Sequence, residues 1–308
     1  MNNNKNKKKK NKKLSNFIIT SAIILAFLIG ISVMLYPMVS NYINSKNQSR
    51  AIDQYNEALS RLSEKDYSAL IAAANEYNTR LYEKATLSGN SKNRFSFTDE
   101  EETEYYKILD FTGTGIIGTL EIDILNINLP IYLGTKESVL QVGIGHLEGS
   151  SLPIGGPGTH SVISGHRGLP SSTLLTHADR LREGDVFKLK VLNEVLYYEI
   201  DQIRRVEPND FDYLGIYPGI DYCTLLTCTP VGVNSHRLLL RGIRIYPNEA
   251  SATDLPKMRV PTEEASEINI IAQYAISAIP IVIILSIVIL VRKIIIKINK
   301  SKNKTKTK

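Results

Sequence analysis

A thiol and a permanent cation stand at the two ends of one predicted hairpin. The strand-forming run Thr224 to Thr227 leads into Cys228, and a second run, Leu238 to Leu240, follows Arg237. The residues between the runs are rich in Pro, Gly and Asn, which indicates a turn. Cys228 and Arg237 should therefore lie side by side. A neighbouring positive charge favours the thiolate, so this pair predicts a nucleophilic cysteine.

A nucleophilic thiol needs a proton partner, and His166 is the best candidate. It follows a predicted strand that ends at Ser164, and the glycines at 165 and 168 leave its ring accessible, as befits a functional loop residue. No Asp or Asn that would orient His166 is visible in the motifs. The other histidines have no neighbours that demand a titrating group, so we expect structural or solvent-facing roles for His146, His160, His177 and His236.

The second cysteine, Cys223, is predicted to pack in the core. It lies five positions before Cys228 in one predicted strand, which is roughly 16 Å, whereas the Cα atoms of a disulfide lie within about 7 Å. The two side chains also point to opposite faces. The same geometry, and the absence of a C-x2-C spacing, argue against a zinc site that combines these cysteines with His160 and His166. We predict neither a metal nor a cofactor.

The middle of the chain reads as a mainly β fold. Gly113 to Gly118 matches the G-x-G-x-x-G dinucleotide pattern, but a strand is predicted after it where that pattern needs a helix, which argues against nucleotide binding. A short helix is predicted over Leu174 to Leu181. Seven short strands predict a closed or nearly closed β-barrel: Ile116 to Ile124, Ile127 to Tyr132, Thr159 to Ser164, Val186 to Leu192, Val195 to Ile203, Asp221 to Cys228 and Arg237 to Tyr246.

Helices are predicted before the barrel. Apolar residues recur at helical spacing from Tyr55 to Leu62 and from Leu70 to Leu81, which indicates two amphipathic helices. Thr98 followed by Glu101 is a capping-box pattern that opens a third, short helix. The acidic residues around Glu101 lie in the first turn of that helix, where they oppose the helix dipole, so a metal-binding role is not needed to explain them.

Two apolar segments are long enough to cross a bilayer. No charged residue occurs from Leu14 to Ser45, and residues 17–39 form the first predicted transmembrane helix. The second covers residues 268–291, where Pro280 is tolerable because membrane helices accommodate proline. A cleaved signal peptide is the alternative for the first segment. We favour an uncleaved anchor because no small-x-small cleavage site follows it.

The charges at the two ends predict the topology. The tails hold 15 of the 37 basic residues and no acidic one, so both are expected in the cytoplasm, with residues 46–267 outside. That outer part then carries 22 basic and 31 acidic residues, a formal charge of −9. The basic tails are expected to contact anionic membrane lipid. A basic patch on the folded part is missing, which argues against nucleic-acid binding.

Four segments together resemble the sortases of Gram-positive bacteria, specifically the class C, pilin-polymerising group. The pattern T-L-x-T-C with an arginine nine residues later is specific to these enzymes, and the C-terminal apolar segment is also typical of class C. The resemblance extends over roughly residues 50 to 245. It rests on Thr159 to Pro170, Thr224 to Pro230, His236 to Gly242 and His146 to Pro153.

The resemblance implies a sortase-type closed β-barrel with Cys228, His166 and Arg237 as catalytic residues. It implies a transpeptidase at the plasma membrane that cleaves a Leu-Pro-x-Thr-Gly-like sorting signal at Thr-Gly and joins the acyl group to a lysine of a pilin. A sortase that attaches surface proteins to a cell-wall precursor is the alternative, and a non-enzymatic membrane-tethered binding module is a more distant one. The expected order is a Lys-rich tail (1–16), the first membrane helix (17–39), a helical and lid region (46–110), the barrel (111–246), a linker (247–267), the second membrane helix (268–291) and a basic tail (292–308).

One departure from the family concerns the lid. Class C sortases usually carry an Asp-Pro-aromatic motif that plugs the active site, and the corresponding segment here, Arg94 to Asp99, has no Asp-Pro pair. Phe95 or Phe97 could fill the groove in its place. The alternative is that both rings pack the third helix onto the barrel.

Overall fold

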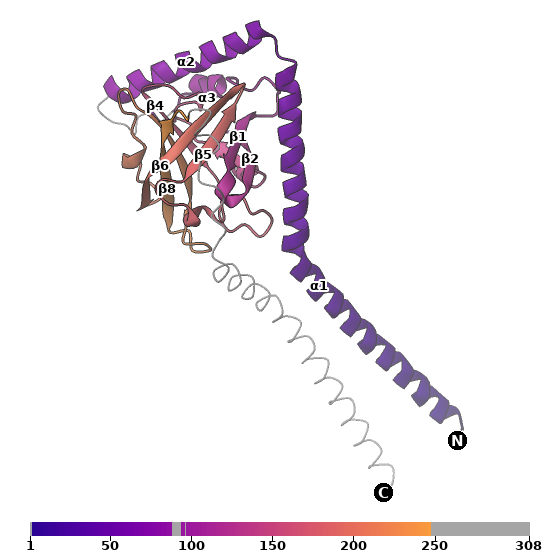
Figure 1. Cartoon of the computed structure of the whole chain (residues 1–308). Helices are drawn as coiled ribbons and strands as arrows, with labels where there is room; N and C mark the ends of the chain where they lie inside the picture. The colour runs from indigo at the N-terminus through magenta and orange to yellow at the C-terminus, as the bar shows by residue number, and fades with distance from the viewer. Residues whose placement is uncertain (1, 88–93, 96, 248–308) are drawn as a thin grey trace. The chain divides into compact units, whose positions relative to one another are not determined.

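The computed structural model describes residues 2–87, 94, 95 and 97–247 (Figure 1). Among the described residues, those from Ser40 onward form one compact unit, which holds the barrel, and those up to Val39 belong to another. The predicted linker (247–267), second membrane helix (268–291), basic tail (292–308) and polar loop (88–93) lie outside the described residues, apart from Pro247.

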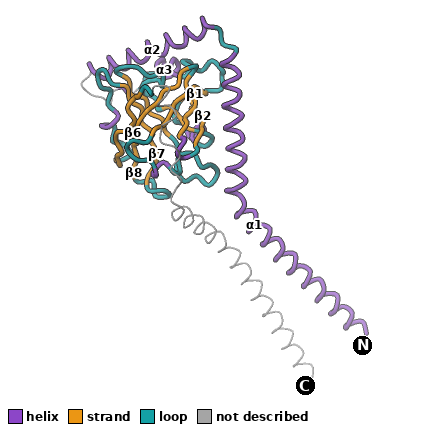
Figure 2. Tube along the Cα trace, viewed as in Figure 1, coloured by secondary structure: helices purple, strands orange, loops and turns teal. Residues whose placement is uncertain are grey.

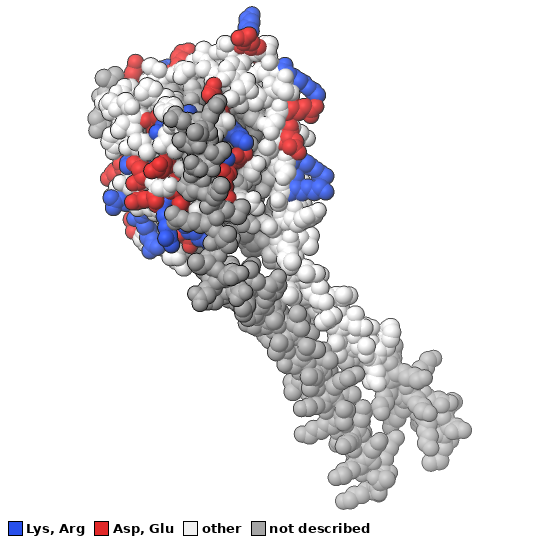
Figure 3. Space-filling model, viewed as in Figure 1, with Lys and Arg blue, Asp and Glu red and all other residues white. Residues whose placement is uncertain are grey.

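The first element, α1 (Asn2–Ser60), contains the predicted anchor. Residues 17–39 carry no charge, and Figure 3 shows a stretch of α1 without blue or red side chains. Large apolar side chains there, such as Phe17, Leu28 and Met38, are more than half exposed. Within the described part of the chain, this helix is long and apolar enough to cross a membrane. The helix expected over the first apolar segment is therefore present.

The helices that precede the barrel follow the predicted order with one change. The first amphipathic stretch is the end of α1 rather than a separate helix, and the second is α2 (Glu64–Leu87). Tyr55 of α1 donates to the carbonyl of Ile117 at 3.1 Å, and Asn78 of α2 exchanges two hydrogen bonds with the backbone of Leu152. These buried contacts attach both helices to the barrel.

The capping box opens α3 (Asp99–Tyr105) as predicted. The Thr98 hydroxyl accepts from the Glu101 amide at 3.2 Å, and the Glu101 carboxylate accepts from the Thr98 amide at 2.9 Å. Figure 1 shows α3 between α2 and the barrel. The helix begins where its orphan amide groups find these partners.

The described strands close into a barrel in the order β1, β2, β3, β4, β7, β8, β6, β5 (Figure 2). The predicted mainly β fold is confirmed, and the one strand that the prediction missed is the three-residue β3. The bounds are β1 (Ile116–Ile122), β2 (Ile127–Leu133), β3 (Ile144–His146), β4 (Thr159–Ser164), β5 (Val186–Val191), β6 (Glu194–Val206), β7 (Asp221–Thr229) and β8 (His236–Ile245). Strand β1 begins within the segment Gly113 to Gly118, so the segment opens no helix that could bind a pyrophosphate.

The helix predicted over Leu174 to Leu181 is wrong. Leu174 has a positive φ of 37°, the next residues form turns, and a 3-10 helix covers only Ala178–Arg180. The backbone here bonds to the neighbouring loop: the Leu175 amide donates to the carbonyl of His166, and the Thr176 carbonyl accepts from Arg167. These tertiary partners replace the bonds that a helix would form within itself.

Side chains of β4, β7 and β8 alternate between two apolar clusters, one inside the barrel and one outside it. Inside the barrel, Ile163, Leu225 and Leu240 belong to the main core. On the outside, Val162 and Leu239 form a smaller cluster with Val206, the last residue of β6, and Leu214. Because side chains alternate along a strand, positions two residues beyond an outward-facing residue also face outward. Leu226, which packs on the outer cluster, therefore places Cys228 on the outer face.

Candidate active site

Cys228 and Arg237 are direct cross-strand partners in the antiparallel pair of β7 and β8. The Cβ atoms of such partners lie about 4.5–5.5 Å apart and point to the same face. The thiol is partly exposed. The structure therefore brings the thiol and the guanidinium together at one mouth of the barrel, as the hairpin predicted.

His166 reaches the same mouth from the other side of β7. Strand β4 pairs in parallel with β7, with Ser164 opposite Leu226. Beyond the last pair, the Gly165 amide donates to the carbonyl of Leu226 at 3.1 Å, and the Thr227 hydroxyl donates to the carbonyl of Gly165 at 2.7 Å. His166 and Cys228 each stand two residues beyond the last pair, so the two residues lie at the same end of β4 and β7.

The glycine before His166 is required by packing. A Cβ atom at Gly165 would lie 2.7 Å from Ile144 and 2.9 Å from Leu175, closer than real contacts allow. The sequence suggested that this glycine leaves the ring uncrowded. Its stronger effect is to let the chain turn tightly against β3, which fixes where the imidazole emerges.

Arg237 keeps its charge available. Its Nη1 donates to the carbonyls of Asn234 and His236, each at 3.2 Å. None of the ion pairs formed among the described residues includes Arg237. Its guanidinium can therefore offer its remaining donors to a carbonyl or an oxyanion at the thiol.

Glu137 is a neighbour of His166 that sequence reasoning missed. It begins α4 (Glu137–Leu140), and its Oε1 lies 3.3 Å from His166 Nε2. Hydrogen bonds from Gln141 and then His166 lower the pKa of the Glu137 carboxyl. The connection from β2 to β3 carries Glu137, and β3 lies beside β4. Recognising β3 would have placed this loop near His166.

The two buried histidines have structural partners. His146 bonds to the Tyr105 hydroxyl and the Ser151 carbonyl, each at 2.8 Å, and burial lowers its pKa to about 4. His160 bonds to the carbonyl of Gly215 at 2.7 Å and to the Thr224 hydroxyl at 2.8 Å. Burial lowers its pKa to about 3. Both rings therefore remain neutral in the folded chain near pH 7.

The two cysteines face opposite ways, as predicted. Cys223 is fully buried in the main core, and both sulfurs are free thiols. Burial, followed by the nearby Asp221 carboxylate, raises the pKa of the Cys223 thiol. That thiol is therefore protonated and shielded, which leaves Cys228 as the accessible sulfur.

The two phenylalanines of the lid segment have different environments. Phe97 belongs to the main core, 6.0 Å from the ring of Tyr105, and so packs α3 onto the barrel. Phe95 lies 4.8 Å from the Phe211 ring in the outer cluster with Leu239. Because Leu239 is two positions from Arg237, Phe95 packs on the same face of β8 as Arg237.

A cleft of about 470 Å³ opens behind the three residues. Its lining includes Arg167, Thr229 and Leu238, each the residue directly after one of His166, Cys228 and Arg237. Arg167 pairs with Asp179 at 2.7 Å. The cleft therefore lies directly beside the chain segments that carry His166, Cys228 and Arg237.

The buried histidines predict an acid-sensitive fold. In the unfolded chain each has an ordinary pKa near 6.5, so below that pH the unfolded state binds protons that the folded state refuses. The free energy of unfolding should fall as the pH drops from about 6.5 toward 4. His160→Asn should make this decline shallower, as measured by urea unfolding at a series of pH values. An identical decline in wild type and variant would contradict the assignment.

Comparisons with known proteins agree with the geometry. The model of the sortase domain matches residues 120–245. The crystal structure of sortase C1 from Streptococcus agalactiae is 47% identical, with a TM-score of 0.60, over 65% of this chain and 100% of that one. Sortase C of Clostridium perfringens, solved with the C-terminal cell wall sorting motif, is 39% identical, with a TM-score of 0.55, over 64% and 99%. The curated sortase A of Streptococcus agalactiae is 24% identical over 206 residues, 64% of this chain and 83% of that protein.

Proposed function

Because this chain belongs to the sortase family, as a cysteine transpeptidase of class C, we propose that it polymerises pilus subunits through Cys228, His166 and Arg237. The observation that carries the proposal is the meeting of these residues at the ends of three adjacent strands, β4, β7 and β8. The substrate would be a pilin or surface protein that ends in a Leu-Pro-x-Thr-Gly-like sorting signal. The likeness to a sortase C solved with such a motif supports this substrate class.

In the first half-reaction, Cys228 Sγ attacks the threonine carbonyl of the sorting signal. The thiol proton passes to His166, a C–S bond forms, the Thr–Gly C–N bond breaks, and His166 gives that proton to the departing glycine amine. Arg237 donates hydrogen bonds to the oxyanion that develops on the carbonyl, or to the adjacent substrate backbone. The product is a thioester on Cys228.

In the second half-reaction, the lysine amine of the next pilin attacks the thioester carbonyl. A C–N isopeptide bond forms, the C–S bond breaks, and His166 takes the proton that the amine loses. The thiol returns to its starting state, so no cofactor is consumed.

Glu137 would act as a positioning residue. Its carboxylate accepts from His166 Nε2 and so fixes which ring nitrogen carries the bound proton, while the other nitrogen is left for proton transfer. Gln141 donates to the same oxygen and holds the carboxylate in place.

The membrane segments would hold the site at the outer surface. In this arrangement residues 17–39 and 268–291 span the plasma membrane, both basic tails lie in the cytoplasm, and the barrel faces the cell wall. The uncharged, exposed surface of α1 supports the first span. Phe95 would serve as the lid residue, because it already covers the outer face beside Leu239.

The proposed polymerisation is tested in cells that express this chain with a pilin carrying a sorting signal. Immunoblots of the pilin should show a high-mass ladder with wild type and only monomers with Cys228→Ala, whereas Cys223→Ala should retain the ladder. Wall-linked monomers without a ladder would contradict polymerisation and favour attachment to a cell-wall precursor.

The role of Glu137 predicts a loss in turnover rather than in binding. Glu137→Gln should lower kcat with a sorting peptide by roughly tenfold, because the imidazole is no longer held in one orientation. The KM for the peptide should change little, and Glu137→Asp should restore part of kcat. Glu100→Gln, on exposed α3, serves as the surface-charge control. An unchanged kcat in Glu137→Gln would refute the positioning role.

A further inference from the structure

Three amide side chains lie on one face of α1, just after the predicted membrane helix. Asn44 and Gln48 follow Asn41 by three and seven positions, which places all three on one side of a helix. Asn41 and Asn44 are half-buried and Gln48 is 8% exposed, whereas Asn47 on the same turn is exposed. All three belong to the compact unit that holds the barrel. We call Asn41, Asn44 and Gln48 the amide stripe.

The amide stripe bonds to the tip of the loop that follows His166. Asn41 Oδ1 accepts from the amide of Thr173 at 2.8 Å and from its hydroxyl at 2.9 Å. Asn44 Nδ2 donates to the carbonyl of Ser171 at 2.8 Å. The two contacts have opposite directions, because Asn41 supplies an acceptor and Asn44 supplies a donor. The loop tip is therefore held by α1 at two of its residues.

Hydrogen bonds within the loop connect its tip to His166. The Leu175 amide donates to the carbonyl of His166 at 3.2 Å. Thr176 accepts from the Gly168 amide through its hydroxyl and from Arg167 Nε through its carbonyl, each at 3.1 Å. The loop thus closes on itself. A shift of its tip therefore moves the backbone that carries the imidazole.

Gln48 joins this loop to the one that carries Glu137. Its Nε2 donates to the carbonyl of Val142 at 2.8 Å and to the Ser172 hydroxyl at 3.3 Å. Val142 lies two residues after α4, the helix that Glu137 begins. Because Gln48 and Ser172 are buried, losing either one would leave a polar group without a partner, which is unfavourable. One side chain of α1 therefore fixes the spacing between the two loops whose His166 and Glu137 side chains meet at 3.3 Å.

We propose that the amide stripe is a positioning element of the proposed active site. It acts through the loops of His166 and Glu137, rather than on the substrate, and keeps the imidazole aligned for proton transfer. Alignment matters because a misplacement of about 1 Å can cost about 100-fold in rate. The inference rests on the proposed function, since it acts through His166. It also makes α1 part of the site, so that the helix with the predicted membrane span aligns the chemistry as well.

Two substitutions of opposite effect test the direction of these bonds in the full chain in detergent. Asn44→Asp replaces the donor with a carboxylate that faces the Ser171 carbonyl, so kcat with a sorting peptide should fall by roughly tenfold while KM changes little. Asn41→Asp keeps an acceptor for Thr173 and should retain at least about half of kcat. Asn47→Asp adds the same charge on the exposed side of α1 and serves as the matched control. Equal kcat values in Asn44→Asp and Asn47→Asp would overturn the proposal.

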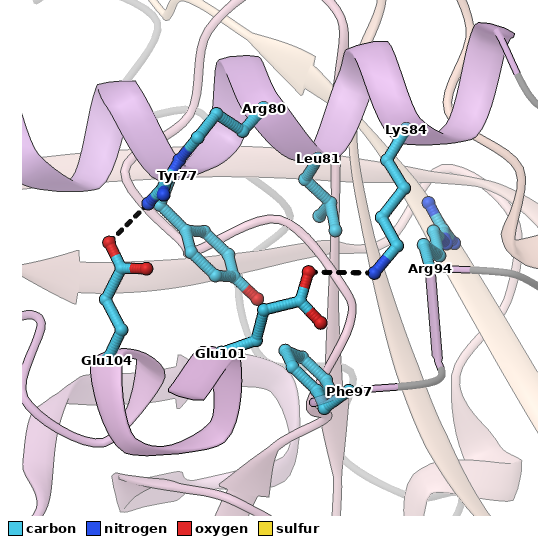
Figure 4. A pocket seen from close by; sticks show the side chains of 8 residues that line it. All are labelled: Tyr77, Arg80, Leu81, Lys84, Arg94, Phe97, Glu101 and Glu104. Atoms are coloured by element: carbon cyan, nitrogen blue, oxygen red, sulfur yellow. Dashed lines mark hydrogen bonds and ion pairs between the residues drawn. The ribbon is translucent and has the colours of Figure 1, made fainter. Parts of the chain in front are cut away.

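A variant on the other helices separates positioning from stability. Arg80 pairs with Glu104 and so connects α2 to α3 (Figure 4). Arg80→Met removes this contact and leaves the amide stripe intact, so kcat should remain, whatever the change in the midpoint of thermal unfolding. A loss of kcat in Arg80→Met equal to that in Asn44→Asp would show a general effect of stability and contradict the positioning role.

Hydrogen exchange, measured by mass spectrometry at single residues, tests the contacts without catalysis. In Asn41→Ala the Thr173 amide loses its acceptor and should exchange about tenfold faster. The Leu175 amide, which bonds to His166, should also exchange faster because the loop passes the shift on, while Asn47→Ala should match wild type. Faster exchange at Thr173 alone would sink the proposal. A wild-type chain that cleaves no sorting peptide would contradict the proposed function instead, so the two failures are told apart.

Discussion

The parallel pairing of β4 with β7 is the interaction on which the rest of the site depends. It runs from Thr159 opposite Asp221 to Ser164 opposite Leu226, and it fixes how far each strand extends toward the mouth. A slip of one residue would turn Cys228 into the barrel, because successive side chains face opposite ways. Closure of the barrel leaves β7 no free edge, and β8 on its other side sets Arg237 against the thiol.

The inner face of β4, β7 and β8 contributes to the core, and the outer face carries the proposed reacting groups. The inner face packs Leu225 and Leu240 into the main core, which holds the strands in register. The outer face combines a neutral, buried His160, the apolar cluster under Phe95 and the exposed thiol. The reacting groups therefore stand at the ends of strands whose other face is packed into the main core.

Local patterns were enough to predict part of this arrangement. Alternation and turn residues gave β7, β8 and the neighbourhood of Cys228 and Arg237. A strand end bordered by glycines pointed to His166. Contacts between distant segments were not predictable in the same way. Strand β3 is too short to show a period, and without it Glu137 had no reason to lie near His166. Leu174 leaves the helical pattern because tertiary hydrogen bonds hold its loop.

The most direct test of the account is to identify the acylated residue. The full chain in detergent is incubated with a sorting-signal peptide and no added amine, then digested and analysed by mass spectrometry. The account predicts a thioester on Cys228 that carries the peptide up to its threonine, that an added amine removes, and that persists in Cys223→Ala. An adduct of equal yield in Cys228→Ala would contradict it.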